Sequence, residues 1–146
     1  MGTRTTGRRR GFALLAAGLL SAGLVLSGAI PASAAPGHQN TDPYNTGCAQ
    51  SKRLVSSKNA MGGTLSVWES TACGTNWTEW YGPRTKVAKY IWTVGAANGY
   101  TTAQFDTAGW SYSMQTYAPG TAVVQGTFVF DGNPITFRCG TGCQWW

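Results

Sequence analysis

Histidine is nearly absent from the chain, since His38 is the only one among 146 residues. Hydrolases of the Ser–His and Cys–His kinds need a base beside the nucleophile and a group that orients it. His38 precedes the first cysteine by ten residues, in a segment that we expect to be mobile. The sequence therefore does not favour a hydrolase of either kind.

Cofactor motifs are missing as well. The chain has no G-x-G-x-x-G before a predicted helix, no Walker motif and no calcium-binding loop. The cysteines do not form two closely spaced pairs of the kind that binds structural zinc. We therefore expect no cofactor and no metal. No internal repeat is present, and beyond residue 34 no stretch has sustained helical periodicity.

Charge is scarce once the first residues are set aside. The whole chain has 11 Lys and Arg against 5 Asp and Glu, a net charge of +6. Four of the arginines lie within residues 4–10, so residues 35–146 hold seven bases and five acids, a difference of +2. So small a net charge does not indicate a nucleic-acid partner.

The first 34 residues have the pattern of a secretory signal peptide. An arginine-rich start precedes an apolar stretch over residues 12–30, and Ala32-Ser33-Ala34 supplies the small residues of a cleavage site. The alternative is a transmembrane anchor, because the apolar stretch is nearly long enough to span a bilayer. We predict cleavage after Ala34, secretion to the medium or the cell wall, and no stable membrane insertion afterwards.

The remaining chain has the length of one domain. Residues 35–47 lack periodicity and are expected to form a flexible mature N-terminus, and residues 48–146 to form a single β domain. Four cysteines in an exported chain predict two disulfides. Of the three possible pairings, nearest neighbours in sequence favour Cys48–Cys73 with Cys139–Cys143.

Alternating apolar and polar residues predict several short strands separated by turn signals. Gly82-Pro83 and Asn98-Gly99 are two of these signals, and residues 101–108 are ambiguous. The predicted strands cover residues 64–70, 76–81, 87–94, 110–117, 122–130 and 135–138. This spacing predicts a mainly β fold, a small antiparallel sandwich or barrel.

Two motifs resemble a known family. Asp42-Pro43-Tyr44-Asn45-Thr46-Gly47-Cys48 is followed by Val67-Trp68-Glu69-Ser70-Thr71-Ala72-Cys73-Gly74-Thr75-Asn76-Trp77. Together they resemble the YjfA-like family, a secreted domain of unknown function in Gram-positive bacteria, over residues 42–80. The resemblance implies an exported domain with a Cys48–Cys73 bridge. It implies no catalytic residue.

Aromatic residues are dense, with 7 Trp and 6 Tyr. Trp77, Trp80 and Tyr81 lie together, and alternation places Trp77 and Trp80 on opposite faces of a strand, so we expect only one of them in the core. Flat rings can stack on sugars or peptides, and Trp and Tyr are frequent at binding hot spots. These three residues are therefore the candidate ligand-binding site, and packing of the rings in a small core is the alternative.

Three functions are compatible with these observations. The first is a secreted, non-catalytic binding protein for cell-wall or other extracellular glycans. The second is an inhibitor or antagonist of an extracellular protein, which would present a disulfide-pinned loop. The third is a glycan-active enzyme that uses Glu69 and Glu79, which lie on neighbouring predicted strands. We expect a protein that is not an enzyme.

Overall fold

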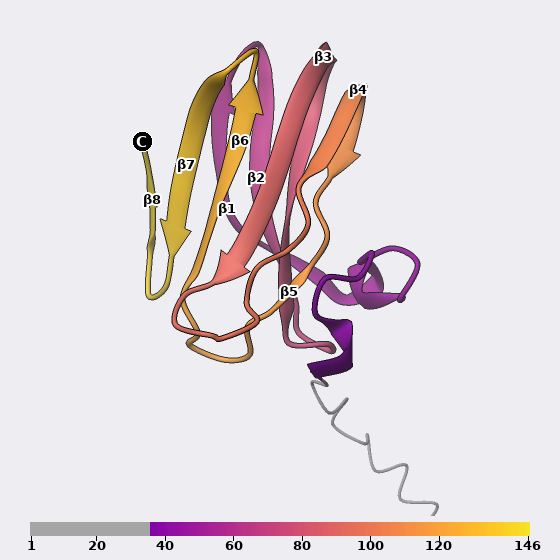
Figure 1. Cartoon of the computed structure of the whole chain (residues 1–146), viewed down its shortest axis with the longest axis vertical. Helices are drawn as coiled ribbons and strands as arrows, with labels where there is room; N and C mark the ends of the chain where they lie inside the picture. The colour runs from indigo at the N-terminus through magenta and orange to yellow at the C-terminus, as the bar shows by residue number, and fades with distance from the viewer. Residues whose placement is uncertain (1–35) are drawn as a thin grey trace, which may run out of the picture.

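The computed structural model describes residues 36–146, and the predicted signal peptide lies outside them. The described part is mainly β, with two short 3-10 helices near its start (Figure 1). Its elements are η1 Pro36–His38, η2 Cys48–Ser51, β1 Lys52–Ala60, β2 Gly63–Ser70, β3 Thr75–Thr93, β4 Gln104–Tyr112, β5 Thr116–Tyr117, β6 Val124–Phe130, β7 Asn133–Cys139 and β8 Cys143–Trp145. Within residues 36–146, no helix has the length and apolar character needed to cross a membrane.

Every pairing between strands is antiparallel. The strand order is β1-β2-β3-β6-β7-β8, with β4 and β5 paired to β3, and β1 contacts β8 across the gap. The sheet is therefore a nearly closed barrel. The predicted mainly β fold, a small antiparallel sandwich or barrel, is confirmed.

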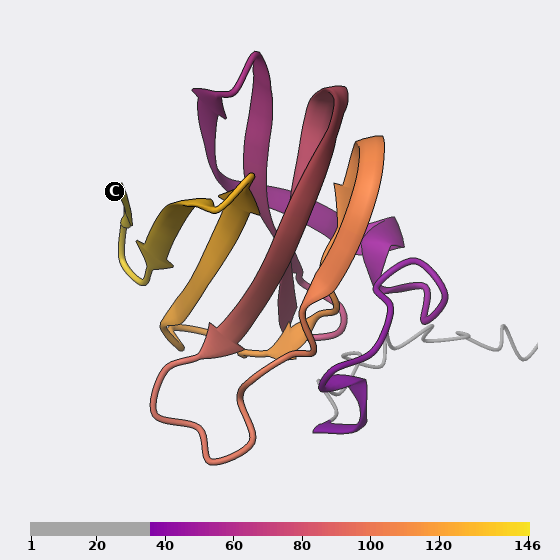
Figure 2. The same cartoon turned by 45° about the horizontal axis from the view of Figure 1, so that its top comes forward.

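Strand β3 is shared by the two halves of the sheet. Its first part pairs with β2 and its second with β6, while β4 borders both parts. The pairing with β4 shifts between Tyr81 and Thr85, where Gly82-Pro83 bends the strand. A Cβ built on Gly82 or on Gly63 would lie 2.7 Å from the other glycine's Cα, so this close crossing needs both glycines. In Figures 1 and 2, β1 and β2 lie behind the layer of β6 and β7.

The core fills the space between these halves. Side chains of β2 and β3 meet those of β6 and β7, and all of the following are fully buried: Leu65, Val67, Trp80, Val87, Ile91, Phe128, Phe130 and Phe137. The Trp80 ring packs edge-on against Phe130 with centroids 5.0 Å apart. Trp80 was expected as a possible ligand contact, and this expectation is wrong because its side of β3 faces the core.

Both predicted disulfides are present. Cys48–Cys73 joins η2 to the turn between β2 and β3, and Cys139–Cys143 closes the turn between β7 and β8. Within residues 36–146 no cysteine is free. Two disulfides in a chain of this size are typical of extracellular or otherwise oxidising surroundings.

The N-terminal segment, residues 36–51, packs on the sheet, although residues 35–47 were expected to be flexible. The backbone N–H of Asn40 donates to the carbonyl of Gln115 at 2.8 Å. The fully buried Gln115 amide donates in return to the hydroxyls of Thr41 and Thr46, at 2.8 and 2.9 Å. Figure 1 shows this segment in indigo beside β5. The polar side chains that gave it a loop-like composition are the groups that fix it in place.

Several strand predictions also change, and β1 and β8 were not predicted from the sequence. Residues 76–81 and 87–94 belong to one bent strand, β3, rather than to two strands. The ambiguous residues 101–108 supply the start of β4, and the predicted strand 110–117 is divided between β4 and β5.

Candidate ligand-binding site

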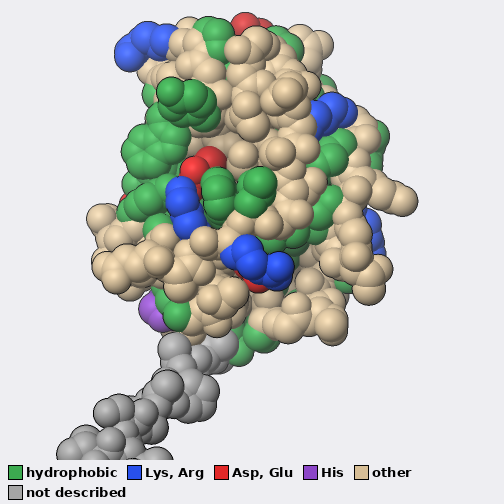
Figure 3. All heavy atoms as spheres, turned by 180° about the vertical axis from the view of Figure 1, so that it is seen from behind, with side chains coloured by type: hydrophobic (Ala, Val, Ile, Leu, Met, Phe, Trp, Pro, Cys, Tyr) green, Lys and Arg blue, Asp and Glu red, His purple; other side chains and the backbone are tan. Residues whose placement is uncertain are grey.

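Aromatic side chains gather on the outer face of β2, β3 and β4, opposite the core. Residues paired across antiparallel strands point to the same face. Tyr81 pairs with Trp110, Glu79 with Tyr112, and Trp68 with Trp77. Figure 3 shows the face seen from behind Figure 1, with hydrophobic side chains gathered on one side around an acidic and a basic side chain. The aromatic surface is defined here as Tyr44, Trp68, Tyr81, Trp110 and Tyr112.

Tyr44 comes from the N-terminal segment and completes this surface. The Tyr44 ring lies 5.3 Å from Trp110, edge-on, and 4.7 Å from Tyr112, while Trp110 and Tyr112 are 5.2 Å apart. The Asp42 carboxylate accepts the backbone N–H of Tyr44 at 2.8 Å, which fixes the turn that presents the ring. Tyr81 is 71% exposed and Trp110 is 47% exposed. Tyr44 and Tyr112 therefore pack against the Trp110 ring and hold it in place, while part of that ring remains open to solvent.

A buried carboxylate holds the surface together. Glu79 Oε1 accepts hydrogen bonds from the Tyr44 hydroxyl at 2.5 Å, the Trp77 indole N–H at 2.9 Å and the Lys52 ammonium at 3.3 Å. Lys52 also lies 4.4 Å from the centroid of the Trp68 ring, a cation–π contact. Burial and the adjacent Glu79 raise the pKa of Tyr44 above its ordinary value of 10.0, so its hydroxyl keeps its proton, and remains a donor to Glu79, even at alkaline pH.

Trp77 does not reach solvent, in contrast to its proposed role in ligand binding. Its side chain is fully buried although it lies on the outer face. Trp77 and Trp80 do point to opposite faces of β3, as alternation predicted. The N-terminal segment covers the outer face, where Tyr44 and Trp77 both donate hydrogen bonds to Glu79. Of the three predicted site residues, the structure leaves only Tyr81 exposed.

A hollow of about 220 Å³ lies beside the aromatic surface, between Asp42 and β4. Its walls combine two carboxylates, an amide and two rings; they are Asp42, Gln104, Asp106, Ala108, Trp110, Ser111, Tyr112 and Met114. Pockets for drug-sized ligands measure roughly 300–1,000 Å³. This β4 hollow therefore suits one ring-sized group rather than a larger molecule.

Both carboxylates of the β4 hollow are anchored. Asp42 accepts from the Tyr112 hydroxyl at 3.1 Å, and Asp106 accepts from the ammonium of Lys89. Lys89 is fully buried, and this burial lowers its pKa, an effect that Asp106 partly offsets. Neither Asp106 nor Lys89 was singled out from the sequence, because nothing in the local pattern of β3 separates a buried lysine from an exposed one.

Glu69 and Glu79, the candidate catalytic pair, do not face each other. Glu69 pairs in register with Asn76, and Asn76 is three positions from Glu79 along β3, so the two carboxylates lie on opposite faces of the sheet. Glu69 forms a salt bridge with Arg53 at 2.6 Å, whereas Glu79 bonds Lys52. The proposed pairing of these two acids for glycoside hydrolysis is wrong.

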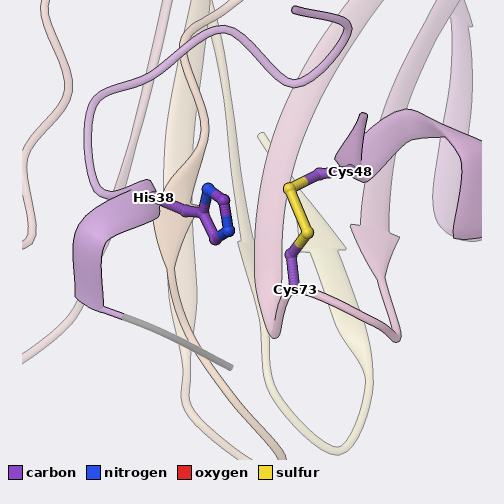
Figure 4. A group of neighbouring side chains, drawn as sticks. All are labelled: His38, Cys48 and Cys73. Carbon is purple, nitrogen blue, oxygen red and sulfur yellow. A yellow bond between two sulfur atoms is a disulfide. The ribbon is translucent and has the colours of Figure 1, made fainter. Parts of the chain in front are cut away.

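His38 lies against the first disulfide, as Figure 4 shows. Its nitrogen and the sulfurs of Cys48 and Cys73 are within 4.8 Å of one another. Metal ligation by cysteine requires the thiolate, and both sulfurs here are joined in a disulfide. Among the residues that the structure describes, no other group of three or more His, Cys, Asp or Glu side chains is close enough to hold a metal ion.

A second and wider hollow, of about 510 Å³, lies at the Cys139–Cys143 loop. Glycine, threonine and Arg138 dominate its walls, and no aromatic ring lines it. It lacks the combination of rings and fixed acceptors that marks the β4 hollow.

No family model, no curated protein and no solved structure matches this chain. The resemblance to the YjfA-like family stays a prediction.

Proposed function

We propose that this chain is a secreted, non-catalytic protein that binds cell-wall or other extracellular glycans at the aromatic surface and the β4 hollow. One observation carries the proposal. Trp110, half exposed and supported by Tyr44 and Tyr112, borders a hollow whose walls include Asp42 and Asp106. The signal-peptide pattern and the two disulfides support secretion.

The chemistry of this site matches that of a sugar. A pyranose ring has an apolar C–H face that packs on an aromatic ring, and hydroxyl groups around its rim. Trp110 offers the ring, while Asp42 and Gln104 offer acceptor and donor groups at the side of the hollow. A ring-sized hollow takes one sugar unit and leaves the rest of the chain on the surface.

The site is formed before any ligand arrives. Tyr44 is fixed by Asp42 and Glu79, and Asp106 is fixed by Lys89. Side chains already held in place lose little conformational entropy on binding, which favours affinity. The fixed carboxylates serve in this proposal as hydrogen-bond acceptors.

The test is retention of the oxidised mature protein on insoluble bacterial cell wall, chitin and cellulose, with salt varied. We expect salt-resistant retention on one polymer, because ring stacking is little screened by ions. Trp110→Ala should weaken retention about tenfold or more, with only the small loss of stability expected from removing its contacts with Tyr44 and Tyr112. Met61→Ala is the matched control, since Met61 is 52% exposed in the turn between β1 and β2 and lies outside the aromatic surface and the β4 hollow.

Two outcomes would contradict the proposal. The first is no retention on any of the polymers, after which binding to a panel of extracellular proteases would test an inhibitor instead. The second is retention of Trp110→Ala equal to that of the parent.

A further inference from the structure

A second group of rings lies away from the proposed site, on the outside of the second part of β3. Tyr90, Trp92 and Tyr100 stack in series, with centroids 5.7 and 5.6 Å apart and planes within 18° and 20° of parallel. Phe105 belongs to the same face, because it pairs with Ala88, which precedes Tyr90 by two positions. The aromatic row is defined here as Tyr90, Trp92, Tyr100 and Phe105.

The aromatic row presents ring surface to solvent. Tyr100 is 67% exposed and Phe105 is 74% exposed. Fully overlapped rings would lie at the carbon–carbon contact distance of about 3.5–4.0 Å. The observed centroid separations are larger, so neighbouring rings are not in full face-to-face contact. The rings of the aromatic row therefore form an apolar strip along the surface of the protein rather than a tightly packed stack.

Polar groups border the row on β6 and β7. Gln125 and Thr127 pair with Trp92 and Tyr90, and they bond across the strands to Arg138 and Thr136, respectively. An anionic membrane surface would call for a cluster of about four to eight Lys and Arg, whereas the row is bordered by two bases, Arg138 on β7 and Lys86 on β3. Hydroxyl, amide and guanidinium groups beside rings complement a polyhydroxylated chain.

The aromatic row and the aromatic surface point away from each other. The row lies outside the β3–β6–β7 half, and the aromatic surface lies outside the β2–β3–β4 half, with the core between them. Along β4 itself, Phe105 and Trp110 are five positions apart and lie on opposite faces. One glycan unit cannot touch both surfaces.

We infer that the aromatic row is a second glycan-binding site, so that one domain holds two glycan chains or two stretches of one polymer. This inference rests on the proposed function, since it takes the same class of ligand. Two linked sites on a polymer raise the apparent affinity by about 10²–10⁴ over either site alone. Each site is then useful even where its own affinity is weak.

The test is isothermal titration calorimetry with soluble oligosaccharides released from the polymer that retains the protein. The parent should bind two oligosaccharides per chain. Trp92→Ala and Trp110→Ala should each bind one, and the double variant none. Tyr100→Ala, which removes a more exposed ring, should weaken the same site as Trp92→Ala, and Met61→Ala is the control. Far-ultraviolet circular dichroism checks that each variant is folded.

The outcomes separate the two proposals. A stoichiometry of one in the parent, abolished by Trp110→Ala and unchanged by Trp92→Ala and Tyr100→Ala, would overturn the second site and leave the proposed function standing. Binding abolished by Trp92→Ala and unaffected by Trp110→Ala would remove the proposed site instead. Absence of any polymer that retains the protein would reject both.

Discussion

Removing the Asp106 carboxylate should destabilise the protein far more than removing its partner, the Lys89 ammonium. The Lys89 side chain is 0% exposed, whereas that of Asp106 is 43% exposed. Asp106→Ala leaves a buried positive charge without its partner, which costs about 3–5 kcal/mol. Lys89→Met puts an apolar side chain of similar length in the buried position, and Asp106 can be hydrated. That change should cost no more than about 1 kcal/mol.

Urea denaturation near neutral pH measures this difference. With a slope of about 2 kcal/mol per molar urea, Asp106→Ala should lower the midpoint by about 2 M, and Lys89→Met by about 0.5 M or less. The double variant, Lys89→Met with Asp106→Ala, should recover most of the loss because no buried charge remains. Its recovery separates an unpaired charge from a simple loss of packing at Asp106.

The dependence on pH gives an independent check. Burial lowers the folded-state pKa of Lys89 below its ordinary 10.5, and Asp106 is the group that raises it again. In Asp106→Ala the pKa falls further. Between the folded and unfolded pKa values the unfolded chain binds more protons, so stability rises with pH in this window.

The free energy of unfolding of Asp106→Ala is lower than that of the double variant, and this difference should shrink as the pH is raised towards the pKa of an ordinary lysine. A difference that stays constant over this range would refute the reasoning. Equal costs for Asp106→Ala and Lys89→Met would refute it too.

Three further predictions use the same denaturation assay. Cys73→Ser should cost about 3.5 kcal/mol and Cys143→Ser about 2 kcal/mol, since the first bridge spans 25 residues and the second 4; equal losses would contradict the loop-closure argument. Trp80→Ala should cost about 3–5 kcal/mol because it empties a buried site, and an unchanged midpoint would show that Trp80 is not in the core. Burial raises the pKa of Tyr44 above 10.0, so above this pH the folded state keeps a proton that the unfolded state loses, and the free energy of unfolding should fall as the pH rises. Tyr44→Phe should make this fall less steep. The same pH profile in Tyr44→Phe and the parent would show that Tyr44 is not the cause of the fall.

Local patterns were enough for the disulfides and for most of the strands, but not for β1 and β8. Alternation found residues 64–70 as a strand because β2 has one face in the core and one on the outside. Nearest-neighbour pairing found Cys48–Cys73 because the turn at Cys73 lies beside η2. The bend in β3 was missed, since Gly82-Pro83 was interpreted as a break, and only the crossing with Gly63 makes a continuous bent strand possible there.

The site could be predicted only in part. Tyr81 was identified, and it is exposed, but only one of Trp77 and Trp80 was expected in the core, on the assumption that the other face of the strand was open, and both are fully buried. That face is covered by a segment far away in sequence, whose docking depends on side-chain hydrogen bonds. Tyr44 lies within the Asp42-Pro43-Tyr44 motif, and the Asx turn predictable from Asp42 was the one local signal that this ring is held in a fixed position.

Glu79 links stability to the proposed binding site. It was a candidate catalytic acid only in the third of the functions considered, and its oxygen joins Tyr44 of the N-terminal segment to Trp77 of β3. Cys48 follows Tyr44 by four residues, so the Cys48–Cys73 bridge holds the same segment at its other end. Opening this bridge therefore lowers the free energy of unfolding and also frees the ring that supports Trp110. Because the segment completes the aromatic surface, the protein cannot lose this docking and keep the proposed site intact.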